Sequence, residues 1–219
     1  MGRFARFWHS SVGKKMVMGA TGLILVGFII LHMAGNLQFF AGAERFNGYS
    51  HLLQHDLIEL TWLLRLTLLA AVALHVLAAY QLTRRSWSAR PEPYEKREPR
   101  VSTSAARTMR WGGVYLLAFI PYHILHFTTG TVHPAFSRDG AYGNVVIGFQ
   151  VAWVGFFYLG AMAILALHLY HGAWASLRTL GAVRPSADPL HRRVALAIAV
   201  VVPLGFSLLP LSVMLGLVR

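Results

Sequence analysis

Five stretches of the chain contain no Asp, Glu, Lys or Arg, and they constrain its fold more than any other feature. They are residues 16–43, 66–83, 111–137, 140–177 and 194–218. A helix needs about 20 apolar residues to cross a hydrocarbon core of about 30 Å, and only the second stretch falls slightly short of that length. Charged residues make up only 13% of the chain, well below the roughly 25% of ordinary soluble domains. The sequence therefore predicts an all-α integral membrane bundle of five transmembrane helices.

The predicted spans are residues 16–40, 57–82, 111–130, 144–174 and 194–218, which form a single transmembrane domain. The second span reaches the required length if it begins near Leu57 and keeps Glu59 and Arg65 at its headgroup end, where long side chains extend to the interface. Residues 84–109 are rich in charge and proline, and this composition predicts a hydrophilic linker.

The distribution of basic residues predicts the orientation in the membrane. Sixteen of the twenty Lys and Arg residues lie before the first span, between the second and third, or between the fourth and fifth. Basic residues in short connections mark the cytoplasmic face. We therefore expect a cytoplasmic N-terminus and an external Arg219. This arrangement explains the net charge of +12 without a nucleic-acid partner.

Six of the eleven histidines fall within or at the ends of spans: His32, His75, His123, His126, His168 and His171. Ionisable groups at membrane depth are costly and usually functional. The depth of His32 is counted from Lys15, and that of His126 from Arg110, because these basic residues mark the start of each span. At about 1.5 Å per residue, both histidines are roughly 24 to 25 Å from the cytoplasmic boundary.

A second pair of histidines lies closer to that boundary. Counting back from Arg84 to His75 and from Arg178 to His168 places both about 14 to 15 Å deep. The two pairs thus define levels about 10 Å apart. A b-type haem needs two opposed imidazoles from facing helices and apolar walls, so each level is a candidate haem site.

Other interpretations of the histidines stay open at this point. Each histidine could instead donate a hydrogen bond to a neighbouring helix. His123 and His171 match neither level and lie one turn from His126 and His168, so we interpret them as hydrogen-bond donors near the ligands. Zinc, di-iron or proton-relay sites would require carboxylate side chains within the membrane. The charge-free runs contain no carboxylate. The absence of cysteine excludes cysteine-bound iron–sulfur clusters and covalent c-type haem.

Three motifs resemble a known family, the membrane-anchor cytochrome b subunits of succinate:quinone oxidoreductases, in their single-subunit, five-helix, di-haem form. The motifs are SVGKK at residues 11–15, HMAGNL at residues 32–37 and, most specifically, HLYHGAW at residues 168–174. The similarity covers nearly the whole chain. The interval from His32 to His75 exceeds that from His126 to His168 by a single residue, and both are as the family pattern leads one to expect.

The resemblance implies a cofactor set and partners. His32 with His126 would bind the iron of an outer haem b, and His75 with His168 that of an inner one. A flavoprotein subunit on the cytoplasmic face would oxidise succinate in the tricarboxylic acid cycle, and an iron–sulfur subunit would pass electrons to the inner haem. The chain would then be the quinone-reactive subunit of a respiratory complex II in the cytoplasmic membrane of a prokaryote.

The resemblance also suggests further residues. Asp56, at the outer start of the second span, is the candidate proton donor at a quinone site beside the outer haem, and we expect the quinone to be menaquinone. On charge alone, Arg84 and Arg178 at the inner rim are candidates to pair with haem propionates. The chain has Ala166 where some two-haem relatives have a glutamate, which puts a transmembrane proton path there in doubt.

Two other functions remain alternatives. One is the cytochrome b anchor of a hydrogenase or a formate dehydrogenase, which would differ in ligand spacing and in its partner. The other is a haem-free membrane anchor or small transporter, in which the histidines only join helices. An optical spectrum distinguishes the last of these from the redox functions.

Overall fold

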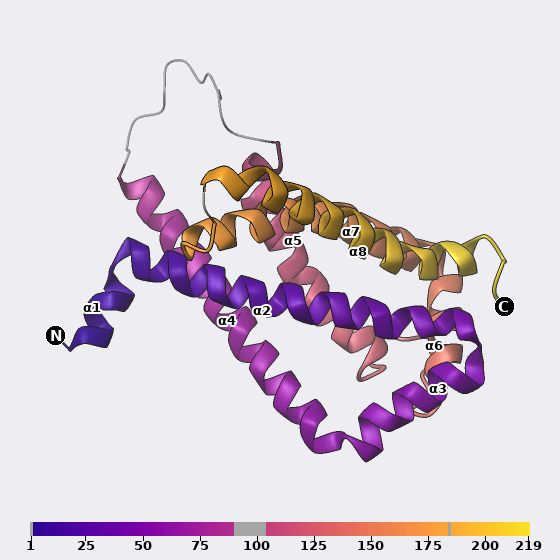
Figure 1. Ribbon diagram of the computed structural model, residues 1–219. Coiled ribbons are helices and arrows are strands. Elements are labelled where there is room, and N and C mark those ends of the chain that lie inside the picture. The colour runs from indigo at the N-terminus through magenta and orange to yellow at the C-terminus, as the bar shows by residue number, and fades with distance from the viewer. Residues whose placement is uncertain (1, 90–103, 184) are drawn as a thin grey trace.

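The structure is a computed structural model of the 219-residue chain, and it describes residues 2–89, 104–183 and 185–219 (Figure 1). The described residues form helices and connections without strands, so the all-α prediction is confirmed for this part of the chain. The α-helices are α1 (Arg3–His9), α2 (Ser11–Leu37), α3 (Ala43–His51), α4 (Ile58–Ser88), α5 (Ser104–Phe127), α6 (Ala141–Gln150), α7 (Ala152–Thr179) and α8 (Asp188–Met214). Short 3₁₀ turns span Gln38–Ala41 and Pro185–Ala187, and a π-helical turn spans Leu52–Asp56.

Among the described residues, four helices are long and apolar enough to cross a membrane: α2, α4, α7 and α8. Much of their apolar surface faces outward, and on α4 the side chains of Leu63, Leu66 and Leu69 are each at least 60% exposed. Such a surface is unfavourable in water and suits contact with lipid. The chain is therefore a multi-pass membrane protein. Helix α5 has 24 residues and contains two histidines, two tyrosines and Pro121, and it is not among these four.

The helix boundaries differ from the predicted spans: α2 begins at Ser11, and α4 and α7 extend to Ser88 and Thr179. Three further differences concern the later spans and the linker. The predicted span 144–174 is interrupted at Val151, whose extended backbone (φ −80°, ψ 101°) separates α6 from α7. The break turns α6 so that its buried apolar side chains pack against the Gln38–Ala41 turn, α3 and α8. Helix α8 begins six residues before predicted residue 194, at Asp188. Of the predicted linker 84–109, both ends belong to α4 and α5, and residues 90–103 lie outside the described residues.

The start of α2, the end of α4, the start of α5, the end of α7 and the start of α8 lie at one end of the bundle, which we call the basic end (Figure 1). There the guanidinium group of Arg85, late in α4, donates a hydrogen bond of 2.8 Å to the backbone oxygen of His9. Arg110, early in α5, donates one of 3.4 Å to Ser86. At the opposite end, α3 meets α6 through a 2.9 Å bond from the Tyr142 backbone N–H to the Asn47 side chain.

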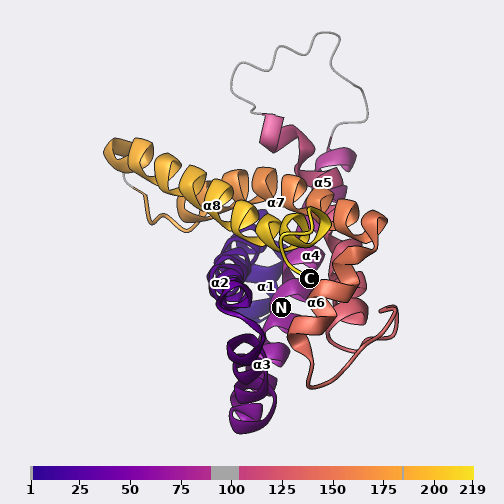
Figure 2. The same cartoon turned by 90° about the vertical axis from the view of Figure 1, so that its right-hand side faces the viewer.

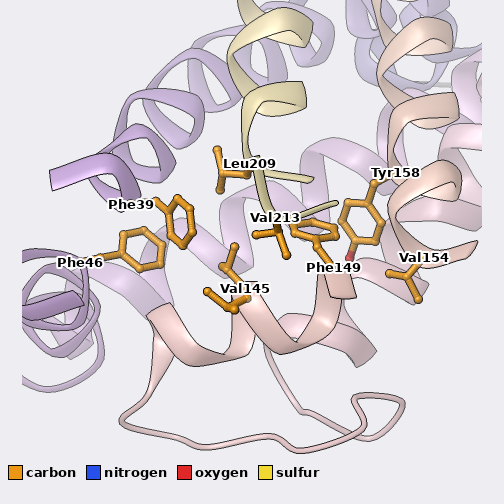
Figure 3. Packing of buried hydrophobic residues seen from close by; sticks show 9 residues of the cluster. Phe39, Phe46, Val145, Phe149, Val154, Tyr158, Leu209 and Val213 are labelled. Atoms are coloured by element: carbon orange, nitrogen blue, oxygen red, sulfur yellow. The ribbon is translucent and has the colours of Figure 1, made fainter. Parts of the chain in front are cut away.

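Two clusters of buried side chains hold the bundle together. The first, at the end opposite the basic end, joins Phe39 and Phe46 to α6, α7 and α8 (Figure 3). The second lies midway along the bundle and joins Met33 on α2 to α7 and α8. Figure 2 shows α7 and α8 running together above α2. The core is therefore centred on α7, while α4 contributes only Ala71 and Ala78 to the buried residues.

Candidate functional site

His75 lies on the α2 side of α4 and has its ring orientation fixed by α2. Its Nδ1 atom is 3.0 Å from the backbone oxygen of Met18 and 3.4 Å from the hydroxyl of Thr21. A carbonyl oxygen only accepts, so Nδ1 carries the hydrogen and donates it to Met18. The neutral imidazole then keeps an unprotonated Nε2. Metal-bound histidines usually donate their other N–H to such an acceptor.

His75 faces His168 of α7, its predicted partner. The two ring centroids are 6.3 Å apart and the ring planes are inclined by 56°. With metal–nitrogen distances of about 2 Å, two imidazoles on opposite sides of one metal ion have their centroids about 6 Å apart. In addition, the Nδ1 atom of His168 is buried without a hydrogen-bond partner. The separation thus fits two axial ligands of one haem iron.

Glycines allow the helices around this pair to approach closely. A Cβ atom at Gly22 would lie 3.3 Å from Cε1 of His75 and 3.4 Å from the hydroxyl of Ser176 on α7. On α5, a Cβ atom at Gly113 would lie 3.9 Å from Cε1 of His168. Small residues at such positions let backbones and flat groups come near one another in membrane proteins.

A cavity of about 310 Å³ opens beside His168, between α5 and α7. Its size is at the lower end of the range of about 300 to 1,000 Å³ that is usual for ligand pockets. The residues that line it are mostly apolar: Thr108, Met109, Trp111, Gly112, Tyr115, Ile164, Leu167 and His168. An apolar pocket with one histidine has the composition expected of a wall for a macrocycle.

At the other level, His32 contacts His123 rather than its predicted partner. The two ring centroids are 5.9 Å apart, edge to face. Phe28 stacks on His32 at 5.2 Å, and Phe206 of α8 lies at 5.6 Å. From its predicted depth, His123 was interpreted as a hydrogen-bond donor near the ligand His126. The contact with His32 makes both histidines of α5 candidates for the partner of His32.

His126, the predicted outer ligand, is 1% exposed and lies among aromatic rings. Its Nδ1 atom is 3.1 Å from the hydroxyl of Tyr158, and its Nε2 atom is buried without a hydrogen-bond partner. A Cβ atom at Gly148 would lie 3.0 Å from that Nε2. Its ring is 5.0 Å from that of His133.

His133 fixes the connection between α5 and α6 next to His126. Its Nδ1 accepts a bond of 3.1 Å from the Ala135 backbone, and its Nε2 donates one of 2.9 Å to the backbone oxygen of Asn144. The side chain of Asn144 in turn bonds both backbone groups of Ser137 at 2.7 and 2.9 Å. Because both nitrogens of His133 are paired, we assign it a structural role.

The remaining predicted residues lie near the two ends. Asp56 ends the π-helical turn and is 3.8 Å from Nδ1 of His51, with both side chains 61% exposed. The ring of His51 stacks on that of His55 at 4.3 Å. Single-turn π segments occur frequently at functional sites.

The two predicted propionate partners at the basic end contact aromatic rings of their own helices. The guanidinium group of Arg84 lies 6.0 Å from the centre of the Tyr80 ring, and that of Arg178 lies 4.9 Å from the centre of the Trp174 ring. His171 is partly exposed, one turn beyond His168 on α7.

Sequence reasoning missed the residues that orient the histidines. The Met18 carbonyl has no signal in a sequence, because any residue supplies one. Tyr158 is far along the chain from His126 and His123, whose rings it contacts, so only the packing of α7 on α5 identifies it. The glycine-rich character of the first span was visible in the sequence, but the particular role of Gly22 was not.

Among the residues that the structure describes, no group of three or more His, Cys, Asp or Glu side chains is placed to hold a metal ion. Haem needs only two protein ligands, so the haem expectation for the histidine pairs does not depend on such a group. In comparisons with models of protein families, with curated proteins and with solved structures, the chain has no match.

Proposed function

We propose that the chain is the membrane-anchor cytochrome b subunit of a succinate:quinone oxidoreductase and that it holds two b-type haems. The proposal combines the resemblance of its histidine motifs to that family with the contacts of those histidines. One observation supports it most strongly. His75 and His168 come from different helices, and their ring centroids are 6.3 Å apart. In addition, His75 donates its Nδ1–H to the backbone oxygen of Met18.

The ligands divide between two levels. His75 and His168 would hold the inner haem, beside the cavity between α5 and α7. His32 and His126 would hold the outer one, with His123 as the alternative partner on α5. On α2, Gly22 and His32 are ten residues apart, which is about 15 Å along the helix and more than the roughly 10 Å that the depth count gives.

The proposed topology has five spans. They are α2, α4, α7 and α8 together with α5, and the basic end lies in the cytoplasm. The segments that meet at that end carry most of the described basic residues: Arg3, Arg6, Lys14, Lys15, Arg84, Arg85, Arg107, Arg110, Arg178, Arg192 and Arg193. Arg45, Arg65, Arg138 and Arg219 belong to the opposite half. This asymmetry favours a cytoplasmic basic end, against which the flavoprotein and iron–sulfur partners would dock.

When bound, the two haems would supply one-electron carriers between the iron–sulfur partner and the quinone. The side chains of this protein would orient the carriers and exclude water. Met18 holds the His75 ring in the tautomer that leaves Nε2 free, and apolar residues of α5 and α7 line the space beside His168. Asp56 would exchange protons with the quinone on the outer side, and menaquinone is the quinone that we propose.

The test is the haem content and spectrum of the purified protein. We expect two b haems per chain in a pyridine haemochrome assay and two bis-histidine low-spin signals in electron paramagnetic resonance. His75→Ala and His168→Ala should each remove the same one of the two signals. A haem-free wild-type chain, or an unchanged spectrum in both variants, would contradict the proposal. His191→Ala is the matched control, since Nδ1 of His191 donates to the Ala187 backbone oxygen at 2.7 Å, at the basic end.

Copurification decides between this function and a hydrogenase or formate dehydrogenase anchor. We expect the chain to be isolated with succinate-oxidising activity when its complex is extracted intact. Activity with hydrogen or formate in place of succinate would refute the assignment of partners while leaving the haem sites in place.

A further inference from the structure

The cavity between α5 and α7 opens on the outer surface of the bundle. It has a volume of about 310 Å³, and most of the residues that line it are apolar. Two of the lining side chains are also exposed, Trp111 on α5 by 81% and Leu167 on α7 by 43%. His75 does not line the cavity, so this space is not the one between the facing rings of His75 and His168. In a multi-pass membrane protein, an apolar opening of this kind meets lipid chains rather than water.

The cavity lies close to the basic end. Its α5 residues run from Thr108 to Tyr115, and α5 begins at Ser104 at that end. From Arg110 to Tyr115 the helix rises by about 7.5 Å. Exposed tryptophans such as Trp111 are enriched where acyl chains meet headgroups. The opening therefore faces the first part of the acyl chains, next to the headgroups.

We propose that this cavity binds an anionic phospholipid of the membrane leaflet at the basic end. One acyl chain enters between α5 and α7, and Arg107 binds the phosphate. The site needs neither haem nor a partner subunit, so it does not rest on the proposed redox function. The lipid closes the side of the cavity that Trp111 and Leu167 leave open.

The position of Arg107 on α5 suits a phosphate. Arg107 is exposed and precedes Trp111 by four residues, so the two lie on the same face of the helix. It is about 6 Å closer to the basic end, and helical side chains lean toward the N-terminus of their helix, which for α5 is that end. A guanidinium group has five N–H donors and matches the oxygens of a phosphate. Arg107 can therefore bind a headgroup directly outside the cavity.

The other arginine of α5 is directed elsewhere. The guanidinium group of Arg110 lies 5.6 Å from the centre of the Trp87 ring and donates a bond of 3.4 Å to the hydroxyl of Ser86. Both of these partners belong to α4, whereas the cavity is on the α7 side of α5. Arg110 thus carries the same charge as Arg107 on the same helix but has no place in the proposed site.

The charge of the basic end favours an anionic lipid over a zwitterionic one. In the described part of the chain, this end has many Lys and Arg side chains and a single carboxylate, that of Asp188. This carboxylate already accepts hydrogen bonds from Trp174 at 2.8 Å and from Arg192 at 3.2 Å. Basic residues at a membrane surface attract anionic headgroups, and the excess of positive charge leaves that attraction uncompensated.

Native mass spectrometry of the purified full-length chain in detergent tests the site, with phosphatidylglycerol and phosphatidylcholine of identical acyl chains as probes. We expect one phosphatidylglycerol to bind about five-fold more tightly than phosphatidylcholine, the factor that one basic residue contributes near an anionic lipid. Arg107→Gln should abolish this preference. Equal binding of the two lipids to the wild type would overturn the proposal.

Arg110→Gln is the matched control, since it removes the same charge from the same helix on the side of α4. We expect it to retain the wild-type preference. An equal loss in Arg107→Gln and Arg110→Gln would show that only the total charge matters and would refute a site at Arg107. Circular dichroism and gel filtration of each variant establish that the fold is intact.

A second pair of variants tests the acyl chain. Leu167→Trp places a larger side chain at the mouth of the cavity and should reduce the binding of both lipids. Leu117→Trp is its control, because Leu117 on α5 is exposed to a similar degree, 41%, but does not line the cavity. Leu167→Phe gives the same test if the tryptophan variant does not fold. Equal lipid binding in the Leu167 and Leu117 variants would contradict an acyl chain in the cavity.

Two competitors identify other occupants. Inorganic phosphate should not displace phosphatidylglycerol at an equal concentration, because it lacks the acyl chain; displacement would mean that Arg107 binds a phosphate alone and would refute the site. A neutral isoprenoid quinone should not displace the lipid either. If the quinone does so, and binds Arg107→Gln as well as the wild type, the cavity takes an apolar tail without a phosphate and the proposal fails. Either failure leaves the proposed haem sites untouched.

Discussion

The Nδ1 atom of His75 on α4 donates a hydrogen bond to the backbone oxygen of Met18 on α2, with 3.0 Å between the two atoms. This bond joins two helices that pack against each other, and it sets the direction of one ring. The ring of His75 also lies near the hydroxyl of Thr21 on α2 and faces the ring of His168 on α7. The pair with His168 is therefore sensitive to the surface of α2.

Replacing Gly22 by valine tests that sensitivity. A Cβ atom there would lie 3.3 Å from the His75 ring, and the two methyl groups of valine would extend further toward it. We expect Gly22→Val to displace His75 and to reduce the inner-haem signal by at least half, measured as haem per chain. Gly27→Val on the same helix is the control, because nothing lies within 4 Å of a Cβ atom at Gly27. Equal haem contents in the two variants would show that α2 does not position His75.

The parts of the fold that the sequence predicts are those that depend on local composition. Charge-free runs predict helices, and a constant rise per residue predicts which histidines share a level; His75 and His168 do meet. The break at Val151 was not predictable, because the apolar run continues through it and packing of α6 on other helices determines the turn. Likewise His123 and His126 differ by three residues, or about 60° around a helix, and only the packing of the helices shows that His32 faces His123.

The start of the first span leads to a second prediction. A Cβ atom at Gly13 would lie 2.8 Å from the backbone carbonyl carbon of Phe7, and the Gly13 N–H bonds the Ser10 side chain at 2.8 Å. Backbone atoms cannot move aside as a side-chain tip can, so Gly13→Ala should separate α1 from α2. We expect faster hydrogen exchange in residues 3–9 by mass spectrometry. Gly2→Ala, which meets nothing within 4 Å, should exchange as the wild type does.

The proposed crossing of α5 can be measured by cysteine labelling, because the chain has no cysteine of its own. Ser88 precedes α5 and Arg138 follows it, and both are exposed. In intact cells, a membrane-impermeant maleimide should label Arg138→Cys at once and Ser88→Cys only after permeabilisation. Labelling of both from one side would mean that α5 does not cross the membrane. Reversed accessibility would invert the proposed orientation.

Asp56 provides the last prediction, because its surroundings separate a role in chemistry from a role in stability. The carboxylate is 3.8 Å from His51 with both groups 61% exposed, and exposed ion pairs contribute only about 0 to 1 kcal/mol. Asp56→Asn should therefore leave the melting temperature and both haem signals unchanged. If Asp56 exchanges protons with the quinone, its loss should slow succinate:quinone turnover of the intact complex by about 100-fold, the lower end of the usual contribution of a general acid or base.

Two further measurements make the role of Asp56 specific. Succinate oxidation with an artificial electron acceptor, which bypasses the quinone, should be unaffected in Asp56→Asn. Glu44→Gln, an exposed acid on the neighbouring helix α3, should retain full quinone turnover. If both variants lose turnover equally, the negative charge of the outer surface matters rather than one proton donor. If neither does, the quinone takes its protons from another group, and the π-helical turn that ends at Asp56 has only a structural role.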